Sequence, residues 1–164
     1  MTSYRIRAAD TGDLAWLARC NAAMALETED KPLDAVTLHA GIASALADGG
    51  KARYFIAMRD AALAGAETIG MPVGSLMLTT EWSDWRNGHW WWIQSVYVMP
   101  EHRRQGVYAA LYRHVERLAR EADGVIGLRL YVETENAYAM ATYAAMGMRD
   151  AGYRVFEAEF VKGV

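Results

Sequence analysis

The feature that most constrains this chain is a strand-like run at Trp90–Val98 that leads directly into a helical pattern. Aromatic and β-branched residues occupy both alternating faces of the run, which is typical of a central strand covered on both sides. After Pro100, apolar residues recur at helical spacing from Val107 to Leu118. A buried strand followed at once by a helix predicts an α/β fold.

The rest of the chain shows weaker strand and helix patterns. Apolar runs bounded by Gly or Pro predict strands, and helical spacing of apolar residues predicts helices. Besides the central strand, strands are expected at Tyr4–Arg7, Arg53–Arg59, Val73–Thr80, Val125–Val132 and Tyr153–Phe160. Two helices precede Arg53, one follows Pro100, and one spans Asn136–Met146, so the predicted order is βααβββαβαβ.

Composition limits the class of protein. With 164 residues and 53% hydrophobic content, the chain can bury one core without disulfides or a structural metal, so residues 1–164 are expected to form a single domain. The lone cysteine, Cys20, favours a reducing compartment. Met1–Arg19 lacks a signal-peptide pattern, and the longest apolar run, Trp90–Met99, is too short to span a bilayer. We therefore expect a cytoplasmic protein that is not bound to a membrane.

A basic turn joins the central strand to the following helix. The net charge of −3 argues against a nucleic-acid partner, but Arg103 and Arg104 could hold a small anion at this turn. The first turn of a helix has unpaired N–H groups and a positive dipole end, which suit a pyrophosphate. Gly106 would let a phosphate approach the backbone. An ordinary turn with solvated arginines explains the same residues equally well.

Two ordered motifs resemble those of the Gcn5-related N-acetyltransferase (GNAT) superfamily. Arg103–Gly106 matches the first half of its R-x-x-G-x-G/A motif, which binds acyl-CoA. Downstream, its N-x-x-A-x-x-x-Y-x-x-x-G-F/M pattern is matched by Asn136, Ala139, Tyr143, Gly147 and Met148. The predicted element order is also similar to that of the superfamily.

The resemblance implies a fold and a co-substrate. The fold would be a mixed, mostly antiparallel central sheet of about six to seven strands flanked by helices, with a splayed pair of parallel strands. The co-substrate would be acetyl-CoA. Its pantetheine arm would enter the gap between the splayed strands and pair with the backbone of Val96, Tyr97 and Val98.

The resemblance also assigns individual residues. The pyrophosphate would rest on the backbone amides of Arg104, Gln105, Gly106, Val107, Tyr108 and Ala109. Arg103 and Arg104 would supply charge, and Asn136 would contact the cofactor arm. Tyr143 would donate a proton to the departing CoA thiolate, which suits a phenol because it is neutral at pH 7. Without the surrounding motif, Tyr143 would be interpreted as a core aromatic residue.

Two residues depart from the superfamily pattern. Tyr108 stands where Gly or Ala is usual, so either its ring points away from the phosphates or the cofactor sits differently. Gln94 stands on the strand where related enzymes carry a catalytic glutamate, and an amide cannot act as a base near neutral pH. Gln94 could instead order a water molecule or simply be a satisfied strand residue.

The base that deprotonates the amine is not singled out by spacing. Residues that could act through water are Glu27, Glu29, Glu81, Asp84, His89 and Glu133. The four histidines lack any paired metal-ligand spacing, and there is no cysteine pair, so no metal is predicted.

Five of the six tryptophans lie within Trp82–Trp92. In one hypothesis, Trp82 and Trp85 line the acceptor pocket, Glu81 and Asp84 attract a cationic amine, and Gln94 also contacts the acceptor. In the alternative, which the general behaviour of aromatic residues favours, alternate tryptophans pack in the core and the others form a dimer contact.

These patterns predict an acetyl-CoA-dependent N-acetyltransferase that acts on the primary amine of a small molecule by direct attack in a ternary complex. Two alternatives stay open. One is a non-catalytic sensor module that binds acyl-CoA, to which Gln94 and Tyr108 point. The other is an acetyltransferase for protein N-termini or lysines. A homodimer is compatible with the tryptophan cluster and with the usual symmetry of oligomers.

Overall fold

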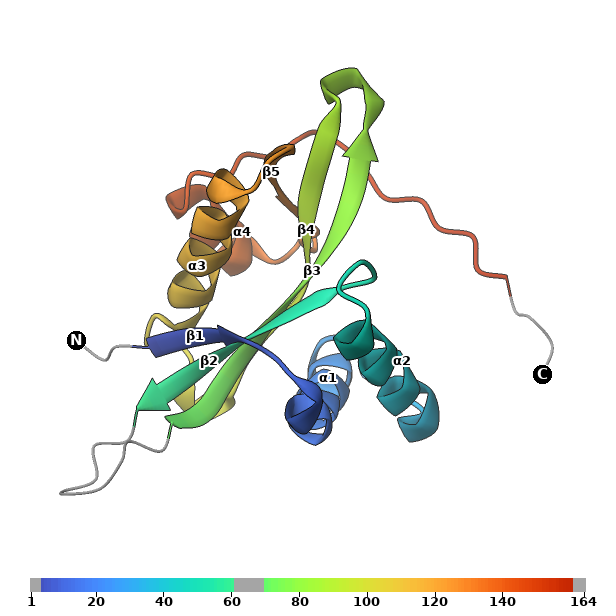
Figure 1. Cartoon of the computed structure of the whole chain (residues 1–164), viewed down its shortest axis with the longest axis vertical. Coiled ribbons are helices and arrows are strands. Elements are labelled where there is room, and N and C mark those ends of the chain that lie inside the picture. The colour runs from blue at the N-terminus through green and yellow to red at the C-terminus, as the bar shows by residue number, and fades with distance from the viewer. Residues whose placement is uncertain (1–3, 61–69, 161–164) are drawn as a thin grey trace. The chain divides into compact units, whose positions relative to one another are not determined.

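The computed structural model describes residues 4–60 and 70–160, which fall into two compact units. The first unit runs to Tyr131 and the second begins at Val132. The strands of the first unit are β1 (Tyr4–Ala8), β2 (Arg53–Asp60), β3 (Gly70–Ser83), β4 (Gly88–Val98) and β5 (Val125–Leu130) (Figure 1). Its longer helices are α1 (Leu14–Glu29), α2 (Ala35–Ala47) and α3 (Val107–Glu121), and the second unit contains α4 (Ala137–Ala145).

The sheet is mixed and mostly antiparallel, as predicted. Its order is β1-β2-β3-β4-β5, with antiparallel pairing from β1 to β4 and a parallel pair formed by β4 and β5. The described residues form five strands rather than six or seven. The strand predicted at Tyr153–Phe160 is wrong, because these residues are exposed and adopt no regular structure. Apolar alternation produces a strand only where neighbouring strands satisfy its backbone and pack against its side chains.

The two parallel strands pair along only part of β4. Their register runs from His89 opposite Val125 to Ile93 opposite Leu130. The rest of β4, Gln94–Val98, pairs with β3 on one side and with no strand of the described chain on the other. Backbone groups on that side therefore remain available to a ligand, apart from the Val98 carbonyl oxygen, which accepts from Arg103 at 2.9 Å.

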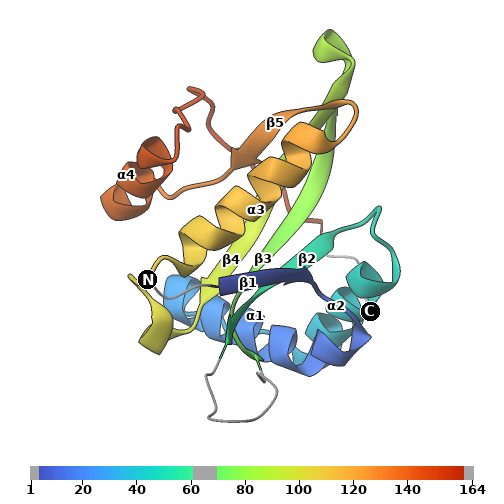
Figure 2. The same ribbon diagram turned by 60° about the vertical axis from the view of Figure 1, so that its left-hand side comes forward.

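Helices cover both faces of the sheet (Figure 2). Tyr54, Ile56 and Met58 on β2 share a buried cluster with residues of α1 and α2. The intervening Phe55 makes an edge-to-face contact with His114 of α3, with ring centroids 5.4 Å apart. Because successive strand residues point to opposite faces, α1 and α2 lie on one face and α3 on the other.

An ion pair fixes the start of α1 against the edge strand. Asp10 and Asp13 form the capping box expected from their spacing. The Asp13 carboxylate also accepts two hydrogen bonds of 2.7 Å from the Arg7 guanidinium on β1. These hydrogen bonds lower the pKa of Asp13 below its usual value.

This pair predicts a pH-dependent stability. Replacing Asp13 with Asn should lower the free energy of unfolding by about 2 kcal/mol at pH 7, because a charge-assisted bidentate contact is lost. A lowered pKa in the folded state stabilises the protein above the unfolded pKa of about 3.9, and this contribution disappears as the pH falls through the folded value. Urea unfolding of both proteins should give curves that converge below about pH 4. An equal difference at pH 3 and pH 7 would contradict this account.

Candidate functional site

The turn after β4 presents the start of α3 without a side-chain cap. Pro100–His102 forms a short 3-10 turn, Arg104 adopts a left-handed backbone with φ 61°, and Gly106 does the same with φ 86°. Gly106 is the N-cap of α3, and within the described chain no side chain accepts from the first N–H groups of the helix. Its left-handed backbone favours glycine. An uncapped helix start of this kind suits an anion.

A close contact fixes this helix start against the sheet. A Cβ atom at Gly74 on β3 would lie 2.9 Å from Val107 Cγ1 and 3.0 Å from the Tyr97 carbonyl oxygen. The glycine therefore lets the first turn of α3 approach β3 and β4. Gly74 was not predicted as a site residue, although an isolated glycine inside a strand pattern is a recognised sign of close backbone approach.

Arg103 faces α1. Its guanidinium donates at 2.6 Å to Glu27 and at 2.9 Å to the Val98 carbonyl oxygen. Glu27 also accepts from the Tyr97 hydroxyl at 3.2 Å, and burial, reinforced by this carboxylate, raises the pKa of Tyr97. The role of Arg103 as a charge partner for pyrophosphate stays a prediction; in this structure its guanidinium pairs with Glu27.

Arg104 is the better cation for this turn. It is exposed, and no acidic side chain pairs with it in the described ranges. The neighbouring Gln105 side chain donates to the Glu101 carbonyl oxygen at 2.8 Å, which holds the turn closed. His102 is buried, and its Nδ1 has no hydrogen-bond partner in the part of the chain described.

Tyr108 lies in the first turn of α3, where the superfamily pattern has a small residue. Its ring centroid is 6.1 Å from that of Tyr112 on the next turn, and its hydroxyl oxygen is buried. The hydroxyl is therefore not part of the exposed surface of the turn. The half-buried Ala109 follows it. The amides of this turn remain the predicted phosphate ligands.

A β-bulge marks the point where β4 leaves β5. Met77 on β3 pairs with Ser95 and Leu78 pairs with Ile93, so Gln94 is the extra residue. The Gln94 side chain is exposed, and its Oε1 accepts from the Thr79 hydroxyl at 3.1 Å. Val96 and Val98, predicted to pair with a cofactor through their backbone, lie on the unaccompanied stretch just beyond.

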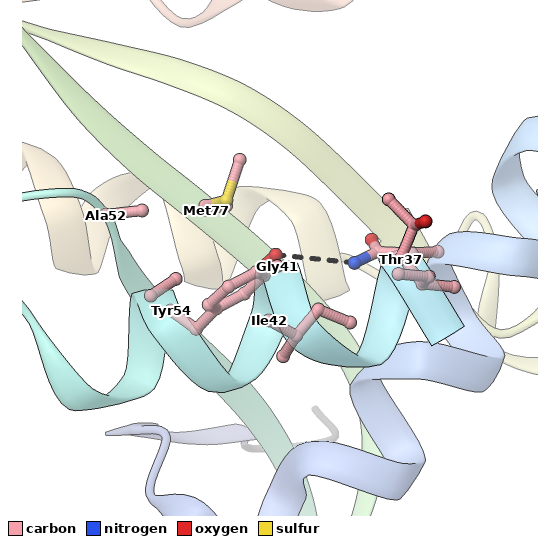
Figure 3. A pocket seen from close by; sticks show the side chains of 9 residues that line it. Thr37, Gly41, Ile42, Ala52, Tyr54 and Met77 are labelled. Atoms are coloured by element: carbon pink, nitrogen blue, oxygen red, sulfur yellow. Dashed lines mark hydrogen bonds between the residues drawn. The ribbon is translucent and has the colours of Figure 1, made fainter. Parts of the chain in front are cut away.

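A cavity of roughly 400 Å³ lies between α2 and the sheet. Figure 3 shows Tyr54 and Met77 on the sheet side and Thr37, Gly41 and Ile42 on the helix side. The lining residues are mainly apolar: Asn21, Thr37, Leu38, Gly41, Ile42, Ala45, Ala52, Tyr54 and Met77. The sequence analysis identified none of these as a substrate contact.

The residues predicted to bind the acceptor do not line this cavity. Trp82, Asp84 and Trp85 lie at the tip of the β3–β4 hairpin, at the top of Figure 1. Trp82 packs edge-to-face on His89 with centroids 4.9 Å apart, and Trp85 is 87% exposed. Asp84 accepts from the Trp85 backbone N–H at 2.9 Å. Their role in acceptor binding stays a prediction.

The tryptophans of β4 have different surroundings. Trp91 is buried beneath the Arg53 guanidinium, which lies 3.8 Å from its ring centroid. Trp92 donates through Nε1 to Glu81 at 2.5 Å, and the other oxygen of Glu81 accepts from Arg129 at 2.8 Å. Both oxygens of Glu81, one of the candidate bases, are thus engaged.

In the second unit, the motif from Asn136 to Met148 begins and ends helix α4. Asn136 is the N-cap of α4, and its side chain accepts from the Ala139 N–H at 3.0 Å. Gly147 ends the helix with a φ of 86°, and the Met148 N–H donates to the Tyr143 carbonyl oxygen at 3.0 Å. Tyr143 is half-buried, and this burial raises the pKa of its phenol.

Residues 4–60 and 70–160 contain no group of three or more His, Cys, Asp or Glu side chains placed to hold a metal ion. Over the same ranges, none of the helices has the length and apolar character needed to cross a membrane.

Known proteins share this fold. The sequence model of the Acetyltransferase (GNAT) family matches residues 20–148. The crystal structure of a possible acetyltransferase from Clostridium difficile 630 is 37% identical, with a TM-score of 0.84 over 97% of this chain and 99% of that one. No curated protein matches.

More distant structures include the aminoglycoside acetyltransferase AAC(6')-Iy with a bisubstrate analogue, at 17% identity and a TM-score of 0.75 over 98% of this chain and all of that one. Another is meta-AAC0020 from an uncultured soil sample with sisomicin, at 16% identity and a TM-score of 0.69 over 97% of each chain. The fold is that of an acetyltransferase. The chain belongs to the GNAT acetyltransferase family.

The Arg104 guanidinium, which pairs with no acidic side chain of the described residues, leads to a prediction. Replacing Arg104 with Gln should weaken CoA binding about tenfold, because one charge-assisted contact to phosphate is lost. Arg104→Lys should retain most of the affinity. Isothermal titration with CoA measures both, and Arg113→Gln on the exposed side of α3 is the matched control. Equal losses for Arg104→Gln and Arg113→Gln would show that only the overall charge matters.

Proposed function

We propose that the chain is an acetyl-CoA-dependent N-acetyltransferase that acetylates the primary amine of a small molecule. The observation that carries the proposal is the parting of β4 from β5 directly before an uncapped helix start. The extended pantetheine arm of CoA needs unpaired strand backbone, and its pyrophosphate needs the free N–H groups at the helix start that follows. Family membership supports the acetyl group as the cargo.

The residues present fit CoA. The stretch Gln94–Val98 offers unaccompanied strand backbone, and the turn at Arg104–Gly106 offers a free cation and a flexible backbone position. A bound acetyl-CoA supplies an activated acyl carbon, to which the amine nitrogen bonds as the carbon–sulfur bond breaks. A backbone N–H at Val98 or a neighbour would hold the carbonyl oxygen.

Tyr143 is the proposed proton donor. Burial raises the pKa of its phenol, so the hydroxyl keeps its proton throughout the neutral range and can give it to the leaving sulfur. The amine must lose a proton before or during attack. Both oxygens of Glu81 and both of Glu27 already accept hydrogen bonds. Among the candidate bases, Glu29, Asp84, His89 and Glu133 stay open, each acting through water.

Small-molecule acceptors are favoured by the cavity between α2 and the sheet. Its volume of roughly 400 Å³ lies within the range typical of small-ligand sites. Structures of aminoglycoside acetyltransferases share the fold, which shows that this architecture can serve small amines.

A conservative substitution tests the proton donor. Tyr143→Phe should lower kcat about a hundredfold at pH 7, because general-acid assistance is lost while the ring is kept. CoA affinity, measured by isothermal titration, should stay within about twofold. The rate is read from CoA thiol release in the presence of an amine.

Two results would count against the proposal. An unchanged kcat in Tyr143→Phe would remove this residue from the chemistry. CoA binding by the unmodified protein without thiol release on any amine would favour a sensor that binds acyl-CoA.

A further inference from the structure

Gly41 occupies an unusual position in the interior of α2. Glycine in a helix interior costs about 0.5–1 kcal/mol relative to alanine. Its backbone is not in the left-handed region, and a Cβ atom built there would meet no atom within 4 Å. Neither conformation nor packing requires a glycine at this position. Gly41 is exposed and lines the cavity, so a side chain at this position would stand at the open mouth of the cavity.

The cavity is chemically simple. None of its lining residues carries a charge. Its polar groups come from Thr37 and from Asn21, whose amide donates to the Tyr54 hydroxyl at 3.3 Å. Leu38, Ile42 and Met77 supply apolar walls. Such a surface favours an uncharged, apolar or aromatic group and penalises the burial of a second ammonium.

Two carboxylates on this face of the sheet are paired with arginines. Glu27 is bound to Arg103 at 2.6 Å, and Glu81, which shares a strand face with Met77, is bound to Arg129 at 2.8 Å. Asp34 accepts from the Thr37 N–H as the N-cap of α2. The Asp34 charge lies outside the cavity lining, so no lining residue offers a polycationic acceptor a carboxylate.

The cavity also adjoins the part of β4 that is proposed to hold the cofactor. Met77, which lines it, pairs directly with Ser95 on β4. Ser95 follows the bulge at Gln94 and begins the stretch without a parallel neighbour. Adjacent strands lie about 5 Å apart, so a small molecule in the cavity can place its amine at this strand.

We propose that the cavity beside Gly41 binds the uncharged apolar body of a monoamine acceptor and that Gly41 sets the size of the group admitted. This specificity rests on the proposed N-acetyltransferase function. The preferred substrate is an arylalkylamine-like molecule with one ammonium group, rather than a polyamine or an aminoglycoside.

Filling the space at Gly41 tests the proposal. Gly41→Leu should raise the Kd of 2-phenylethylamine for the CoA-saturated protein at least tenfold, measured by isothermal titration. Gly41→Ala should have a smaller effect. Leucine and alanine are better helix formers than glycine, so thermal stability should not fall, and CoA affinity should be unchanged. Ala43→Leu adds the same side chain at an exposed position of α2 outside the cavity and is the matched control.

A charge substitution tests the class of acceptor. Asn21→Asp places a carboxylate in the cavity wall and should shift kcat/KM toward spermidine and away from 2-phenylethylamine. The unmodified protein, assayed by thiol release, should prefer 2-phenylethylamine to both spermidine and sisomicin.

The outcomes separate this inference from the proposed function. Amine binding that Gly41→Leu abolishes, without acetyl transfer to any amine, would support the cavity assignment and overturn the N-acetyltransferase function. Acetyl transfer that prefers spermidine or sisomicin, or that Gly41→Leu leaves unchanged for every amine, would overturn the cavity assignment and keep the function. Equal losses in Gly41→Leu and Ala43→Leu would also overturn it.

Discussion

The early end of pairing between β4 and β5 is the constraint on which the rest of the site depends. A parallel pair that continued to Val98 would satisfy the backbone of β4 on both sides and leave nothing for a ligand to bind. The pair is held firmly over its first half. A Cβ atom at Gly127 would lie 2.5 Å from the Trp90 ring, and the Arg129 guanidinium lies 4.2 Å from the centroid of that ring. Close packing thus holds β4 and β5 together where they pair, while the last part of β4 stays without a parallel neighbour.

The bulge at Gln94 and the glycine at Gly74 act on the same stretch of β4 from two sides. The bulge changes the register between Met77 and Leu78, so that Ser95 and Tyr97 face α1 and α2. Gly74 lets Val107 approach the other face. The proposed cofactor and acceptor sites are therefore placed by the same few residues of one strand.

The sequence predicted the regular elements well because their patterns are local. Helix α3 has a strong apolar stripe, and the helix predicted from Asn136 begins there, with Asn136 as its N-cap. The strand predicted at Tyr153–Phe160 failed because strand formation depends on a partner that no local pattern specifies.

Long-range contacts explain what else could not be predicted. The ion pair of Arg103 with Glu27, 76 positions away, has no local signal in the sequence. The cavity draws on α1, α2, β2 and β3, and the space beside Gly41 exists only once these elements are assembled. No spacing rule could have joined Asn21 to Tyr54 and Met77.

The single cysteine has a practical consequence for studying this protein. Cys20 is 5% exposed within α1, and burial raises the pKa of its thiol to about 11. Since the thiolate is the reactive form, the folded chain has almost no nucleophilic sulfur near neutral pH. Disulfide reagents that report free thiols by a colour change can therefore follow CoA continuously with a low protein background. A slow rise in that background would in turn report unfolding, because Cys20 reacts only once the core around it opens.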